Sequence, residues 1–182
     1  GEKPSVFFLV PSPPGISPGQ RFRFEQYLPF LDEAGIRYKV RPFLSFRGRN
    51  MLYSSGHIIG KGLVMLAGFM RRCRDMFALI GYDYIYIHRW VTIAGPPVYE
   101  WIIAKILRKK IIYDFDDAIW VHESHYNHRF LAIKFLGKVS KICKWSYKVS
   151  VGNSYLKEMA IKHNPNVVIV PTVVNTETVH GG

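Results

Sequence analysis

The sequence predicts an α/β fold with a doubly wound, mostly parallel sheet that carries helices on both faces. Short β-branched and aromatic runs alternate along the chain with longer segments whose apolar residues recur at helical spacing. The clearest buried strand covers residues 111–113, and three carboxylates follow it directly: Asp114, Asp116 and Asp117. Ligands of open α/β sheets bind at the carboxyl ends of the strands. We therefore expect this acidic turn to lie at the mouth of a ligand cleft.

Composition limits the partners of the protein. The 182 residues suit one domain, or one half of a larger enzyme, and the 48% of hydrophobic residues can form a substantial core. The formal charge of +12 favours an anionic partner, which could be nucleic acid, an anionic membrane surface or a phosphorylated ligand. A further domain could instead balance this charge. Cys73 and Cys143 lie beside apolar residues in helical patterns and are interpreted as core thiols of a reducing compartment.

The first strand, Ser5–Val10, leads into a loop rich in proline and glycine at residues 11–20. The loop glycines, Gly15 and Gly19, do not form the G-x-G-x-x-G fingerprint, which argues against a nicotinamide enzyme. A loop of this kind after a first strand approaches a ligand or closes a tight turn.

A first helix is predicted over residues 21–34 and ends at Gly35. Arg21 and Arg23 lie at its start, where cations oppose the helix dipole. They indicate either an anion held near the loop or two solvated side chains.

A strand is predicted at residues 38–43, a loop at 44–56 and a long amphipathic helix at 57–80. The apolar residues that share one face of this helix are Ile59, Leu63, Leu66, Met70, Cys73, Phe77 and Ile80. We interpret this face as packed on the sheet. Cations elsewhere on the helix leave contact with an anionic membrane as the alternative.

In the second half, a strand at residues 83–87 ends at His88 and Arg89. The further predicted elements are helices at 95–108, 129–145 and 153–163 and strands at 148–151 and 167–170. Lys134, Lys138 and Lys141 are interpreted as a solvated stripe on the second of these helices. The loop histidines, His122, His125 and His128, lack the spacing of metal ligands, so no metal site is expected.

The order of these signals resembles the amino-terminal half of a family 4 glycosyltransferase, whose GT-B architecture has two facing Rossmann-like domains. The resemblance covers nearly the whole chain. The matching segments are the first strand with its glycine loop and QRFR at 20–23, YDYIYIH at 82–88, IIYDFDDAIW at 111–120, VSVGNSYL at 149–156 and VPTVVN at 170–175. The resemblance implies that residues 1–182 form a single Rossmann-like domain and that the second domain, which carries the donor-binding glutamate pair, is absent from this sequence.

This resemblance implies an enzyme of polysaccharide biosynthesis that transfers a sugar from a nucleotide-sugar donor to an acceptor hydroxyl on a glycan or a lipid-linked molecule. The chain would supply the acceptor side of the cleft and would be inactive alone. No cofactor or metal is expected, and the nucleotide sugar is a co-substrate. The implied site residues are Asp116 and Asp117 for catalysis, Gly15, Gly19, Arg21 and Arg23 at the donor phosphates, and His88 and Arg89 on the acceptor side.

Two other readings stay open at the level of sequence. The acidic strand also resembles the signature of a haloacid dehalogenase-like phosphatase, with Asp114 as nucleophile, Asp116 as acid/base and Mg²⁺ as cofactor. That signature normally follows a first strand, whereas here at least three strands precede it. A non-enzymatic basic module is the other reading. Residues 41–53 mix cations and aromatics, but nothing resembles a nucleic-acid module, so no nucleic acid is expected. We expect a location in the cytoplasm or at the cytoplasmic face of a membrane, with peripheral contact to anionic lipid.

Overall fold

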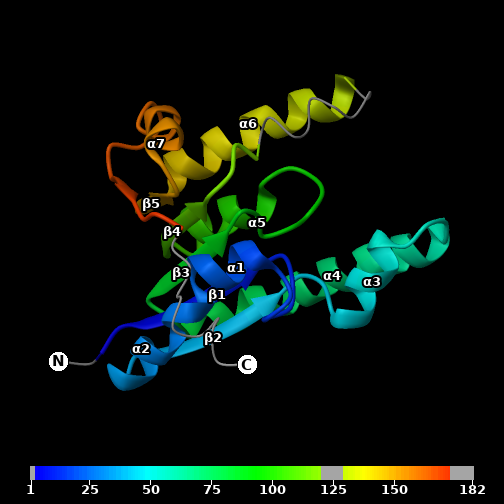
Figure 1. Ribbon diagram of the computed structural model, residues 1–182, viewed down its shortest axis with the longest axis horizontal. Coiled ribbons are helices and arrows are strands. Elements are labelled where there is room, and N and C mark those ends of the chain that lie inside the picture. The colour runs from blue at the N-terminus through cyan, green and yellow to red at the C-terminus, as the bar shows by residue number, and fades with distance from the viewer. Residues whose placement is uncertain (1–2, 120–128, 173–182) are drawn as a thin grey trace, which may run out of the picture.

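Residues 3–119 and 129–172 are described by the computed structural model (Figure 1). Their strands form one parallel sheet in the order β2-β1-β3-β4-β5-β6. The strands are β1 (Ser5–Val10), β2 (Arg37–Pro42), β3 (Tyr84–His88), β4 (Lys110–Phe115), β5 (Lys148–Val151) and β6 (Val167–Ile169). The strand order reverses beside β1, so the predicted doubly wound α/β fold is confirmed.

Helices connect these strands on both faces of the sheet. The α-helices are α1 (Pro18–Arg23), α2 (Leu28–Glu33), α3 (Phe46–Tyr53), α4 (Ile58–Ala78), α5 (Val98–Trp101), α6 (Arg129–Trp145) and α7 (Ser154–Ala160). Two short 3₁₀ turns, η1 (Glu25–Tyr27) and η2 (Leu79–Gly81), and a π-helical segment, η3 (Ile102–Ile106), extend them. Asn153 caps α7 as its residue type predicts, because its Oδ1 accepts the backbone N–H of Leu156 at 2.9 Å.

The pleat of the strands divides the apolar residues between two cores. Phe7 and Leu9 point to the larger core, which also receives η3, α6 and α7 through Ile103, Ile142 and Leu156. The alternate residues of β1 point to the opposite face. There Phe8 and Val10 pack with Phe24, and Leu28 and Leu31 pack against this smaller cluster. Both faces of the sheet are therefore covered, which is why the strands are apolar on both sides.

The first predicted helix is broken into three pieces. Pro18 begins α1 earlier than expected, and the chain passes through η1 before Leu28 and Pro29 start α2. Gly35 ends the segment in the left-handed region at φ 62°, as predicted. The predicted loop at residues 44–56 is wrong in part, because it contains α3. Ser45 caps this helix by accepting the backbone N–H of Gly48 at 3.0 Å.

The long helix α4 lies within the predicted range of residues 57–80, but its apolar face does not pack on the sheet. Ile59, Leu63 and Met70 are 82%, 62% and 64% exposed, and Phe77 on the same face is also exposed. The opposite face is buried and carries Gly68, Arg72 and Asp75. The interpretation of the stripe as a core face is therefore wrong.

Arg72 explains which face of α4 is buried. Its guanidinium donates to the carbonyl oxygens of Val10, Arg41 and Val91, at 2.8, 2.9 and 2.6 Å, and to Asp75 at 3.0 Å. These carbonyls lie at the carboxyl ends of β1 and β2 and just beyond β3, so one side chain pairs acceptors of three chain segments. Burial lowers the pKa of Arg72 to about 10, against the opposing charge of Asp75.

Two further expectations about side chains are wrong. Cys73 is exposed, whereas Cys143 is buried as predicted. Lys138 is fully buried and donates to the carbonyl oxygen of Thr92 at 3.0 Å, so it does not belong to a solvated stripe. The loop histidines 122, 125 and 128 and the segment 173–182 lie outside the described residues.

Candidate functional site

A row of polar side chains crosses the centre of the sheet at the carboxyl ends of the strands. The strand register places His88 of β3 beside Asp114 of β4, and Asp114 beside Ser150 of β5. All three side chains are buried and lie on the face of the sheet that α1 covers. A polar row at this depth needs internal partners, because unpaired buried polar groups are costly.

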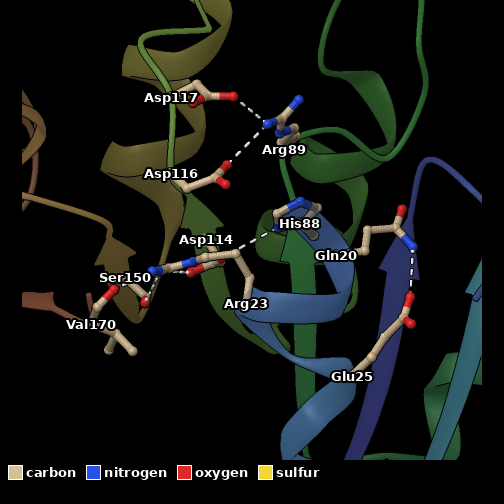
Figure 2. Close-up of polar contacts among 10 residues, drawn as sticks. All are labelled: Gln20, Arg23, Glu25, His88, Arg89, Asp114, Asp116, Asp117, Ser150 and Val170. Atoms are coloured by element: carbon tan, nitrogen blue, oxygen red, sulfur yellow. Dashed lines mark hydrogen bonds and ion pairs between the residues drawn. The ribbon is translucent and has the colours of Figure 1, made fainter. Parts of the chain in front are cut away.

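Arg23 supplies the central partner (Figure 2). Its Nε donates to Asp114 Oδ2 at 3.2 Å, one terminal nitrogen also pairs with Asp114 Oδ1, and Ser150 Oγ accepts at 3.0 Å. The carbonyl oxygen of Val170 accepts from the other terminal nitrogen. One guanidinium thus joins α1 to β4, to β5 and to the chain that follows β6.

Asp114 is ionised within this cluster. Burial alone would raise its pKa, but hydrogen bonds and positive charge from His88 and Arg23 hold the pKa of this carboxyl below its usual range. His88 Nδ1 lies 2.9 Å from Asp114 Oδ2. An ionised carboxylate here makes Nδ1–H the donor, which leaves Nε2 as the ring nitrogen that this bond does not use.

A second, more exposed cluster lies just outside the first. Arg89 holds Asp116 Oδ1 at 3.0 Å with its Nη2, and the same nitrogen pairs with Asp117 (Figure 2). Arg89 has φ 60°, a left-handed conformation that a residue with a Cβ adopts only at a cost. Strain of this kind is concentrated at functional sites. The turn directs the guanidinium toward the two carboxylates that follow β4.

Two glycines bring backbone close to Asp116. A Cβ on Gly19 would lie 3.4 Å from Asp116 Oδ2, 3.5 Å from Arg89 Nη2 and 4.0 Å from His88 Nε2. A Cβ on Gly152 would lie 3.2 Å from the Asp116 Cα. Gly19 therefore marks the place where the loop after β1, the end of β3 and the acidic turn after β4 meet.

A pocket of about 170 Å³ opens beside this meeting point. Its lining comes from the loop after β1, from α3 and from the end of β3: Pro11, Ser12, Ser17, Gln20, Leu44, Arg49, Tyr53, His88, Arg89, Trp90 and Ile93. The Nε atoms of Arg49 and Arg89 are buried and have no hydrogen-bond partner among the described residues. A lining that contains two arginines and no carboxylate fits an anionic ligand.

The sequence-predicted site residues divide into two groups. Gly19, His88, Arg89, Asp116 and Asp117 come together at the carboxyl ends of β1, β3 and β4, as the contacts above show.

The others lie apart from this cluster or serve the fold. The backbone N–H of Gly15 donates to Glu25 at 2.8 Å and its α-carbon faces open space. Arg21 is exposed over the ring of Phe22. Arg23 is buried in the Asp114 cluster, so its guanidinium is engaged within the protein. The phosphate-neutralising role of Arg21 and Arg23 stays a prediction.

Sequence reasoning missed several residues of the site. Arg49 was assigned to a loop, yet α3 carries it to the pocket. Gln20 is buried and bridges the loop after β1, where its amide pairs with both the N–H and the C=O of Ser12 at 2.9 Å. The support of His88 by Asp114 depends on strand register. The only sequence signal for it was that both residues end predicted parallel strands.

No group of three metal-ligand side chains occurs among residues 3–119 and 129–172. In the same part of the chain, no helix is both long enough and apolar enough to cross a membrane. Neither a protein-family model nor a curated protein matches the chain.

Proposed function

We propose that this chain is the acceptor-side domain of a glycosyltransferase that uses a nucleotide-sugar donor. The observation that carries the proposal is the His88–Asp114 pair at the carboxyl edge of the parallel sheet, where His88 lines a pocket together with Arg49 and Arg89. Asp116 and Asp117 lie beside it, held by Arg89. The order of motifs that resembles family 4 glycosyltransferases supports the choice of sugar transfer among the reactions that such a site could serve.

In the proposed reaction, an acceptor hydroxyl attacks the anomeric carbon of the donor sugar. The new oxygen–carbon bond forms as the bond from that carbon to the diphosphate oxygen breaks, and the nucleoside diphosphate leaves. His88 Nε2 takes the hydroxyl proton, with Asp114 stabilising the resulting imidazolium. Asp116 and Asp117 stabilise positive charge on the sugar, and Arg49 and Arg89 bind anionic oxygen.

The phosphatase alternative is disfavoured by the position of Asp114. A nucleophilic carboxylate must reach its substrate, but Asp114 is not among the residues that line the pocket, and its oxygens pair with Arg23 and His88.

The test uses the full-length gene product, because the resemblance places donor binding on a second domain. Transfer from a panel of radiolabelled nucleotide sugars to oligosaccharides and to a lipid extract is measured. We expect Asp116→Asn to lower kcat/KM by about 10²–10³ and His88→Gln by about 10²–10⁴. Glu33→Gln, a change on the exposed end of α2, is the matched control and should keep full activity.

The proposal is wrong if no donor in the panel supports transfer, or if both site variants keep wild-type activity. Hydrolysis of p-nitrophenyl phosphate that requires Mg²⁺ and Asp114 would instead favour the phosphatase.

A further inference from the structure

The outer face of α4 is an apolar surface that the proposed function leaves unexplained. Ile59, Leu63, Leu66, Met70 and Phe77 line this face and all are more than half exposed. The face is about 27 Å long from Ile59 to Phe77 at the rise of an α-helix. Ile58, which is 85% exposed, continues the apolar surface at the start of the helix. A continuous apolar strip of this length marks an interaction surface.

The strip belongs to a helical hairpin that projects from the sheet. Figure 1 shows α3 and the first half of α4 extending beyond the strands. Close glycine contacts join the two helices: a Cβ on Gly48 would lie 3.0 Å from Val64 Cγ1, and one on Gly60 would lie 2.7 Å from Met51 Sδ. The hairpin is therefore a packed unit, and the opposite face of α4 is fixed to the sheet by Arg72.

The charge of the chain around the hairpin indicates which kind of partner binds the exposed face of α4. Residues 43–82 contain six Lys and Arg residues and a single acidic residue, Asp75, which is buried and paired with Arg41 and Arg72. Arg47 and Arg74 are exposed on the hairpin. A second copy of this chain would bring the same positive charge to the interface. A partner with an apolar interior beneath a negatively charged surface fits the hairpin better than a second copy does.

We propose that the α3–α4 hairpin docks on a bilayer that contains anionic lipids, with the outer face of α4 inserted among the acyl chains below the headgroups and Arg47 and Arg74 at the lipid phosphates. The proposal rests on the exposed strip and the charge of the hairpin, and it holds whether or not the chain belongs to a transferase. An amphipathic helix with one face packed on its own protein presents the other face to the membrane plane. The hairpin also carries Arg49 and Tyr53, so docking would bring the candidate pocket close to the lipid surface.

The first experiment measures co-sedimentation of the 182-residue chain with phosphatidylcholine vesicles, with and without phosphatidylglycerol. We expect binding that requires phosphatidylglycerol and weakens with salt. The variant Leu63→Gln/Leu66→Gln should lower the partition coefficient by about tenfold or more, since two apolar side chains no longer enter the bilayer. Arg74→Glu should also weaken binding. A matched control, Phe30→Gln/Tyr155→Gln, removes two equally exposed aromatic side chains on α2 and α7 and should leave binding unchanged.

A second measurement locates the membrane-facing surface. Cys73 is exposed beside the strip, whereas Cys143 is fully buried, so an environment-sensitive fluorophore will label Cys73. We expect its emission to shift to the blue on adding phosphatidylglycerol vesicles, and brominated lipids to quench it.

The proposal is overturned if the wild-type chain does not bind these vesicles at low salt, or if the Leu63/Leu66 variant binds as well as the wild type. It is also overturned if the strip instead drives formation of a dimer or capture of an acidic protein. Vesicle binding needs no sugar nucleotide, so failure of this proposal is distinguishable from failure of the transferase assay.

Discussion

At the scale of single residues, the carboxyl edge of the sheet contains an inner and an outer ion-pair cluster with different burial. Arg23 and Asp114 are each 1% exposed in their side chains, whereas Arg89 and Asp117 are 30% and 51% exposed. Water screens the outer pairs, which contribute little to stability. The inner pair is shielded, so loss of one partner leaves an uncompensated charge. We infer that the inner cluster stabilises the fold and the outer one is available to a ligand.

This difference gives a prediction for two aspartate-to-asparagine variants. Asp114→Asn should lower the free energy of unfolding by about 3–5 kcal/mol, because Arg23 loses its buried counter-charge. Asp117→Asn should lower it by less than about 1 kcal/mol. Urea unfolding followed by circular dichroism measures both. Equal effects for the two variants would contradict the division into an inner and an outer cluster.

The same carboxylate predicts a pH dependence. The pKa of Asp114 is lower in the folded than in the unfolded protein, so its contribution is complete above the unfolded value of about 3.9. The contribution is lost as the pH falls from there through the folded pKa. The wild type should therefore lose stability on acidification below about pH 4 more steeply than Asp114→Asn.

At the scale of elements, periodicity identifies the residues that share a face but not the direction of that face. The α4 stripe was predicted residue by residue, yet it points away from the sheet. The opposite face of α4 can approach the sheet closely because it carries Gly68, and the ring of Phe43 packs directly against that glycine. No propensity or hydrophobic pattern shows that an Arg–Asp face will be buried, because the carbonyl acceptors that pair Arg72 come from distant strands.

Two glycines of α4 provide a matched test of this packing. A Cβ on Gly68 would lie 2.6 Å from Phe43 Cε1, whereas one on Gly62 would have nothing within 4 Å. Gly68→Ala should destabilise the protein by about 1–3 kcal/mol through overpacking. Gly62→Ala should stabilise it by about 0.5–1 kcal/mol, because alanine has the higher helix propensity. Thermal unfolding of the two variants decides the matter, and a neutral Gly68→Ala would show that α4 is not seated against Phe43.

At the scale of the whole molecule, the sequence predicts the parallel sheet but not the side-chain contacts at the carboxyl ends of its strands. Strands such as β1 and β5 and the helix α6 have their predicted bounds, because apolar runs and turn residues are local signals. The pairing of Arg23 with Asp114 joins residues 91 positions apart. Such a contact depends on the order and the register of the strands, and local sequence patterns determine neither of them.

Arg72 is the contact through which the hairpin is coupled to the rest of the molecule. Arg72→Met should destabilise the protein by about 3–5 kcal/mol, because Asp75 keeps only Arg41 and three carbonyl oxygens each lose one hydrogen bond. Arg74→Met, two residues along and exposed, should change stability by less than about 0.5 kcal/mol. Hydrogen exchange of the α4 amides should show faster opening in Arg72→Met alone. Unchanged exchange would place the attachment of the hairpin elsewhere.

The left-handed backbone of Arg89 has a consequence for how this protein responds to selection. Only glycine or asparagine would occupy that conformation at little cost, so a library screened for heat resistance alone should favour replacing this arginine. The selected variants would be more stable than the wild type, but they would lack the cation that holds Asp116 and Asp117. An arginine kept at this position is therefore a residue whose value lies in what it binds rather than in how well the chain folds.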